Sequence, residues 1–424
     1  MDLGVNEFVD GLLSEGAHQK PSDNGHVADL QHKMRLPEWF DEEKYDNGRR
    51  FFWKYCFGFG QSMTLGLATV FAVHSVLKVL MGTRRSNSTY TSYNRYRSTM
   101  MHVMAWLQYE LKPGTLSWRS LHAVRGRHVR AGKAAVAKGQ GIVSQRDMAL
   151  TMMGLVGFAV LKPDKFSIRQ NKSGDWEGFV HFWRTVGYML GVEDRYNICR
   201  KNIDETREVC RMIQERVFAP CLENVPEYYE HVARAMLEGQ SILNAHIETS
   251  SSLFWIRYLA DVPGYIYTEA DRIAFQKKLR ENQDGQSDDK GVDTAKLTYK
   301  SAIEGLPDLP PRFLHVKEFD TIETTPAYKQ LNFVARYRLA LNSIEMAFYN
   351  TELGRFILNL MYRWDNFIDY YFPFKAFLRF GIRKAYVNMF EEDPKDETKP
   401  RLNAEFTKPT TSDTWYGKLF SILW

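Results

Sequence analysis

From Arg49 onward, apolar residues recur along the chain every three to four positions, the spacing of one face of an α-helix. No run of alternating β-branched residues is long enough to predict a sheet. Glycine, proline or a capping residue bounds each helical stretch, such as Thr115 after a Lys-Pro-Gly turn and Asn202 before an apolar run. The pattern predicts a mainly α protein with helices over residues 92–111, 115–139, 144–160, 176–191, 197–219, 227–249, 252–261, 268–282, 327–350 and 353–391.

The stretch from Tyr55 to Leu77 has 23 residues without a charge and lies between Lys54 and Lys78. This length is sufficient for a helix that crosses a membrane. Three glycines, a glutamine and a histidine interrupt the stretch, and such polar content favours a buried core helix. Both interpretations are compatible with the sequence, and the core helix is preferred.

Two parts of the chain lack helical periodicity. Residues 1–35 are polar and predict a flexible N-terminal tail. Residues 276–326 combine an acidic stretch that is poor in apolar residues with a proline-rich loop, and they predict a surface linker or insertion. Between these parts we expect a single large helical domain over residues 36–275, and after the linker a C-terminal segment over residues 327–424.

The C-terminal segment is rich in aromatic residues between Phe348 and Tyr386, with arginines and lysines among them. Pro373 predicts a break within this helical stretch. One interpretation is a core helix that packs on the main domain. The other is an amphipathic helix that lies at a membrane interface, where Tyr and Trp are enriched.

Charge is unevenly distributed along the chain. Between Asn47 and Arg146 there are 16 Lys and Arg against the single acid Glu110, a net +15; because the whole chain carries +5, the remainder carries −10. An anionic partner for this basic block is expected, such as haem propionates or phospholipid head groups. The charges lie along apolar helices without a DNA- or RNA-binding motif, so no nucleic-acid partner is expected.

The four cysteines form neither a CxxC pair nor a CxxCH haem-attachment signature. The first residues are acidic and lack both the basic flank and the long apolar run of a signal peptide. These features predict an intracellular, reducing location.

The stretch 115–139 places arginine, histidine and glycine in one stripe. A haem requires an imidazole for its iron, guanidinium groups for its propionates and a small residue where the flat ring approaches the backbone. His128 is therefore the candidate axial ligand of the iron, and Arg125 and Arg130 are candidates for binding a propionate. A solvated basic helix face is the alternative, and spacing does not exclude His122 as the ligand. The stripe consists of Trp118, Leu121, Arg125, His128, Gly132 and Ala135.

A second stripe, on the preceding helix, consists of Arg95, Thr99, His102 and Trp106. If it met the His128 stripe across a flat cofactor, Arg95 and Thr99 would hydrogen-bond bound oxygen and His102 would lie on the distal side. The alternative is a partly exposed helix whose polar residues cap the loop before it. Farther along, Arg184 follows Trp183 and precedes an apolar run; if buried, it needs an anion, such as a propionate.

Four segments in this order resemble the family that contains bacterial latex-clearing rubber oxygenase and the fungal ER-bound oxygenase of mycophenolic acid synthesis. They are GTRRSNSTYTSYNRYRST, VRGRHVR, SQRDMALTMMGLVGF and HFWRTVGYMLGVEDRYN, and the resemblance covers roughly residues 50–220. The sequence looks most similar to animal members, in which HFWR-x-x-GYxLG and ED-x-YN recur.

The resemblance implies an all-helical fold with a globin-like core and a non-covalent b-type haem whose axial ligand is His128. It implies that Arg95 and Thr99 are catalytic in an O2-dependent cleavage of C=C bonds in isoprenoid chains. A hydrophobic or lipid substrate and membrane association, for instance with the endoplasmic reticulum, follow as expectations.

Two positions depart from the family. Ser98 replaces a lysine of rubber oxygenase, and no acid lies between Asp46 and Glu110, where the family has a glutamate. A non-catalytic haem- or lipid-binding helical protein at a membrane is therefore the alternative to an oxygenase.

Overall fold

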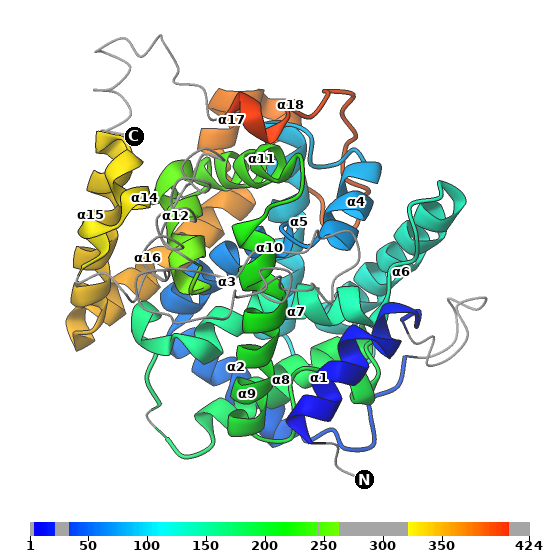
Figure 1. Ribbon diagram of the computed structural model, residues 1–424. Coiled ribbons are helices and arrows are strands. Elements are labelled where there is room, and N and C mark those ends of the chain that lie inside the picture. Colours follow the sequence, from blue (N-terminus) through cyan, green and yellow to red (C-terminus); the bar gives the residue numbers. More distant parts are fainter. Residues whose placement is uncertain (1–3, 22–33, 171, 245, 263–320, 407–424) are drawn as a thin grey trace, which may run out of the picture.

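Helices form nearly all regular structure in the computed structural model, which describes residues 4–21, 34–170, 172–244, 246–262 and 321–406 (Figure 1). No β-strand occurs in these ranges, so the predicted mainly α fold is confirmed. The helices are α1 (Val5–Leu13), α2 (Glu42–Lys54), α3 (Cys56–Val70), α4 (His74–Gly82), α5 (Thr89–Gln108), α6 (Leu116–Ala137), α7 (Gln145–Leu161), α8 (Asp175–Met189), α9 (Ile203–Ile213), α10 (Ala219–Glu223), α11 (Tyr229–Ser241), α12 (Thr249–Leu259), α14 (Pro326–Gln330), α15 (Phe333–Tyr349), α16 (Glu352–Tyr371), α17 (Phe374–Phe380) and α18 (Ile382–Ala385).

Helix ends follow the capping residues that the sequence predicts. The Thr115 side chain accepts a hydrogen bond from the Trp118 backbone at the start of α6, and Asn202 caps α9 in the same way. The chain breaks at Pro373, between α16 and α17. The helix predicted over 197–219 is wrong at its start, because α9 begins at Ile203 and continues through a π-helical turn into α10. The predicted helix over 268–282 lies outside the described residues.

The prediction of a flexible tail over residues 1–35 is wrong for its first part. Residues Val5–Leu13 form α1, and Phe8, Val9 and Leu12 are fully buried. Their spacing places these apolar side chains on one face, which packs against α9. The helix is short and polar on its other face, so its average composition concealed this apolar stripe.

Close helix crossings build the centre of the molecule. Almost every residue of α3 is buried, and α3 packs along α7 while α2 packs along α8. Gly66 of α3 meets Gly154 of α7, and Gly48 of α2 meets Gly178 of α8, with backbone against backbone. A methyl group at any of these four positions would overlap a neighbouring atom, so glycine sets the distance between the helices.

The uncharged stretch 55–77 forms α3 and the start of α4, and the chain bends by 90° between the two helices. Within the part of the chain that is described, no single helix is long and apolar enough to cross a bilayer, and only this bent pair meets that test together.

Asn359 attaches α16 to the core. Its Oδ1 accepts hydrogen bonds from the backbone N–H of Phe57 at 3.2 Å and from the Tyr349 hydroxyl at 2.8 Å. Its Nδ2 donates to the carbonyl of Lys54 at 2.8 Å. One side chain thus satisfies the backbone where α2 passes into α3, and thereby holds the C-terminal helix against the first half of the chain.

Replacing Asn359 by leucine is expected to lower the free energy of unfolding by about 2–3 kcal/mol, because two partly buried donors and one exposed carbonyl lose their partner. Urea unfolding followed by circular dichroism measures the change. Asn366→Leu is the matched control, since the Asn366 side chain donates to the Tyr362 carbonyl one turn earlier in its own helix, and its loss should cost less than about 1 kcal/mol. Equal losses in both variants would contradict this role of Asn359.

Candidate functional site

His128 lies on α6 with a buried Nδ1 atom. Within the described residues, that atom has no hydrogen-bond partner. Burial, together with the nearby charges of Arg95 and Arg127, lowers the pKa of the imidazole to about 4. The ring is therefore neutral at physiological pH. A neutral imidazole with a free nitrogen is the form that binds a metal ion.

The α5 stripe faces α6, as expected from its spacing. The two helices pack together, and Arg95 is close enough to His128 for its charge to act on the imidazole. The Arg95 guanidinium donates to the Thr83 hydroxyl at 3.0 Å, and the Thr99 hydroxyl donates to the Arg95 carbonyl at 2.9 Å. The structure thus brings His128, Arg95 and Thr99 to the same junction of α5 and α6.

His102 is engaged on both ring nitrogens. Its Nε2 lies 3.2 Å from a guanidinium nitrogen of Arg127, which can only donate, so Nε2 accepts. The proton must then be on Nδ1, which donates to the Ser120 hydroxyl at 2.7 Å. Trp106 donates to the same hydroxyl at 2.8 Å. This argues against the predicted distal role of His102, because both of its nitrogens already bind protein groups.

A segment from the C-terminal region, residues 386–398, lies across α5 and α6 and is called the strap below. Arg127 donates to the carbonyl of Met389 at 2.7 Å and also to that of Glu391, while it reaches Ser98 on its other side at 3.2 Å. The Phe390 ring meets the His102 ring edge-on, with centroids 6.0 Å apart. The strap therefore forms one wall of the site.

The strap also brings acids to the basic block. Glu392 pairs with Arg85 and lies 3.8 Å from Arg130, and Glu397 pairs with Arg84. Part of the anionic partner expected for this block is thus the chain itself. These acids were not among the predicted site residues. The acidic run at 391–397 is opposite in charge to the basic block, and this could have indicated the contact.

The remaining predicted propionate ligands are dispersed. Arg125 points toward the end of α8, where it donates to the Met189 carbonyl at 3.4 Å, and Arg130 is exposed beside the strap. Arg184 forms an ion pair with Asp194 at 3.1 Å and stacks on the Trp39 ring at 3.9 Å. Arg184 was expected to need an anion if buried. It is only partly buried, and Asp194 already supplies an anion, so nothing here supports a propionate at this position.

The residues at His128 fit a haem in their chemistry. A haem iron takes four ligands from the porphyrin and needs only one side chain from the protein, and His128 offers a neutral, unpartnered nitrogen. Gly132, one turn later, leaves open space on its helix face: a methyl group there would meet only Val143, at 3.7 Å. In the described residues, no group of three or more His, Cys, Asp or Glu could hold a bare metal ion.

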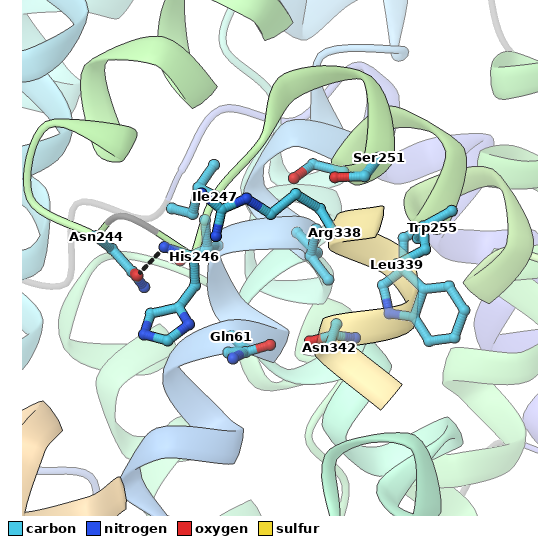
Figure 2. A pocket seen from close by; sticks show the side chains of 12 residues that line it. Gln61, Asn244, His246, Ile247, Ser251, Trp255, Arg338, Leu339 and Asn342 are labelled. Carbon is cyan, nitrogen blue, oxygen red and sulfur yellow. Dashed lines mark hydrogen bonds between the residues drawn. The ribbon is translucent and has the colours of Figure 1, made fainter. Parts of the chain in front are cut away.

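A pocket opens in another part of the molecule, between α3, α12 and α15 (Figure 2). Gln61, His246, Trp255, Arg338 and Asn342 are among its lining residues. It contains none of the residues that the sequence singled out, and His246 at its edge is paired with Glu345 at 2.6 Å.

Two buried histidines make stability depend on pH. Burial lowers the pKa of His102 and His181 to about 4, and each Nε2 accepts a hydrogen bond, in His181 from the Asp41 backbone at 3.0 Å. Unfolded histidine titrates near 6.5, so between about pH 6.5 and 4 the unfolded chain binds protons that the folded chain does not. Stability should therefore fall as pH decreases through this window and level off below it.

Urea midpoints measured from pH 7.5 to 4 check this expectation. His181→Gln keeps an acceptor for Asp41 but cannot be protonated, so its stability should depend less steeply on pH than that of the unchanged protein. Parallel pH curves for the two proteins would show that His181 does not contribute.

The comparisons with known proteins give one relative by sequence and one by structure. No family model matches the chain. The rubber oxygenase of Streptomyces sp. (strain K30) is 28% identical over 218 residues, which make up 47% of this chain and 49% of that protein. The structure of latex clearing protein LCP in the closed state is similar with a TM-score of 0.42 and 16% identity, covering 69% of this chain and 82% of that one. The chain is thus homologous to a rubber oxygenase and spans about half of that relative's length.

Proposed function

We propose that this protein is a haem-dependent oxygenase that uses O2 to oxidise an unsaturated hydrophobic substrate, an isoprenoid or a lipid, by C=C cleavage or a related reaction. The observation that carries the proposal is the neutral imidazole of His128, whose buried Nδ1 atom has no hydrogen-bond partner among the described residues. The sequence similarity to a rubber oxygenase supports the same chemistry.

His128 would hold the iron of the haem, and bound haem supplies the activation of O2. Arg95 and Thr99 lie at the same junction of α5 and α6 and would orient oxygen-bearing groups through their guanidinium and hydroxyl. Among the described residues, the Arg95 guanidinium donates one hydrogen bond, to Thr83, and its other N–H groups could bind a ligand. Arg85 and Arg130 stand beside the strap and are suited to bind propionates, in competition with Glu392.

The fold brings charged groups near both positions that depart from the family. Arg127 donates to Ser98, so a permanent cation stands beside the position where rubber oxygenase has lysine. The strap brings Glu391, Glu392 and Asp393 near Arg127, although no acid precedes α5 in the basic block. These contacts favour an active site over an inert one.

A specific observation favours the alternative of a haem or lipid binder without turnover. Glu392 and Glu397 are both in ion pairs with arginines, and the Arg85 pair lowers the pKa of Glu392. A carboxylate held ionised beside an arginine is a weak proton acceptor. If a base is required, the strap acids are not adapted to that role.

Haem reconstitution followed by an oxygen assay tests the proposal. The purified protein should develop a Soret band with haemin, and should then consume O2 in the presence of polyisoprene or squalene and release carbonyl products. Thr99→Val, which keeps size but removes the hydroxyl, should keep the band and slow turnover at least tenfold. A band without oxygen uptake would establish a non-catalytic haem binder. Failure to bind haem would exclude the oxygenase and the haem binder, and would leave only the lipid binder.

A further inference from the structure

The C-terminal helices turn apolar side chains toward solvent. On α16, a stripe at helical spacing consists of Leu353, Phe356, Leu360, Trp364, Phe367 and Tyr371, and all six residues are exposed. On α15, Phe333, Tyr337, Ile344 and Phe348 form a similar exposed stripe. An outward helix face in a soluble domain is normally polar, so this arrangement is the reverse of the usual one.

The opposite face of α16 is the one that packs on the protein. Asn359 and Tyr362 contact α3 there, and Leu358 is buried. Asp369, which is partly buried, follows this inner side of the helix, about half a turn away from the apolar stripe. Docking on the core has therefore fixed the orientation of α16, and the apolar stripe cannot turn inward.

Basic residues extend the apolar surface beyond α16. Between Tyr370 and Phe390 the chain has Lys375, Arg379, Arg383 and Lys384, all exposed, and no acid. Among them, Leu378 is 89% and Ile382 is 71% exposed. Apolar side chains reaching outward between cations are typical of a helix that lies in the head-group region of a bilayer.

The exposed apolar residues are concentrated in this part of the molecule. Of the 21 exposed large hydrophobic side chains in the described residues, 18 lie between Phe333 and Phe390. Figure 1 shows α15 and α16 at the left of the molecule and α17 with α18 at its top, away from α1 at the lower right. Scattered exposed apolar residues need no explanation, but a concentration of this size marks an interaction surface.

We propose that helices α15 to α18 form an interfacial membrane-binding surface that inserts its apolar stripes into a leaflet with anionic head groups. Charge complementarity selects the lipid surface as the occupant, because the rim of the patch toward α17 and α18 is entirely basic. Trp364, Tyr370 and Tyr371 are the residue types that prefer the interface. Binding at the surface requires no spanning helix and no haem, so the proposal is independent of the proposed oxygenase activity.

Vesicle flotation with the full chain tests this surface. Binding to phosphatidylcholine vesicles that contain phosphatidylserine should exceed binding to phosphatidylcholine alone, and should weaken as salt is raised. The triple variant Phe356→Ser, Leu360→Ser, Trp364→Ser should bind at least tenfold more weakly, and Lys375→Glu with Arg379→Glu should remove the preference for phosphatidylserine. All five positions are exposed, so the variants should keep the circular dichroism spectrum of the unchanged protein.

Matched controls separate this surface from unspecific adhesion. Val136→Ser removes an equally exposed apolar side chain on α6 and should bind vesicles like the unchanged protein, as should His128→Ala.

Two results would overturn the proposal. One is concentration-dependent dimerisation that the triple variant abolishes, without vesicle binding, since a second copy would then be the occupant. The other is binding that appears only after deletion of residues 407–424, which would identify the chain's own end as the cover.

Discussion

His128→Ala is expected to abolish the Soret band of the haem-reconstituted protein and to reduce haem affinity by at least a hundredfold. The reason is that the substitution removes the one neutral, unpartnered nitrogen that the α5–α6 junction offers to an iron. The folded state should persist, because Nδ1 makes no hydrogen bond within the described residues that the substitution could break. Absorption spectra during haemin titration, together with circular dichroism, measure both effects.

His122→Ala is the matched control for that experiment. His122 lies on the same helix, two turns before His128, and its side chain is exposed. Spacing alone did not exclude His122 as a ligand, but an exposed imidazole does not line a buried cofactor site. Its replacement should leave the Soret band unchanged. Loss of the band in His122→Ala but not in His128→Ala would reassign the ligand and refute the site described above.

Gly66→Ala is expected to destabilise the fold by about 3 kcal/mol or more. A methyl group at Gly66 would overlap the Gly154 carbonyl oxygen, and this oxygen belongs to a backbone that cannot move away as a flexible side chain would. The helices α3 and α7 must therefore separate, which loosens the packing of the buried α3. Urea unfolding measures the loss, and the protein should also melt at a lower temperature.

Gly11→Ala is the control for Gly66→Ala, because it adds a methyl group to a helix at a position without a close helix crossing. Gly11 lies inside α1, and no atom is within 4 Å of the position that a methyl group would take. Alanine is the better helix former by about 1 kcal/mol, so this variant should be neutral or slightly more stable. If Gly66→Ala unfolded at the same urea concentration as Gly11→Ala, the close crossing would not be a determinant of the fold.

Periodicity and capping located most helices because both act over a few residues. The α6 and α7 boundaries lie within two residues of the predicted ranges 115–139 and 144–160, and Pro373 ends α16 as expected. The same local rule placed Arg95 and Thr99 on one face of α5. Backbone hydrogen bonding and side-chain spacing are properties of consecutive residues, so a single sequence reveals them.

Predictions were less accurate where a residue's interaction partner is far away in the sequence. The sequence showed that Arg184 needs an anion, but only folding brings Asp194 to it. The residues around His102 could not be foreseen either, since Arg127 and Ser120 belong to another helix. The α1 face was missed because α9, its packing partner, lies about two hundred residues away.

Local patterns were thus sufficient to predict the helical class and the helix faces, whereas the choice of His128 as the candidate ligand rested on the family resemblance. The neutral state of its imidazole, the strap over α5 and α6 and the outward turn of the α16 stripe depended on the packed fold. These three properties arise from burial and from charges that are remote in the chain, such as Arg95 beside His128 and Glu392 beside Arg85. Desolvation and ion pairing act through space, so they are fixed only when the helices have packed.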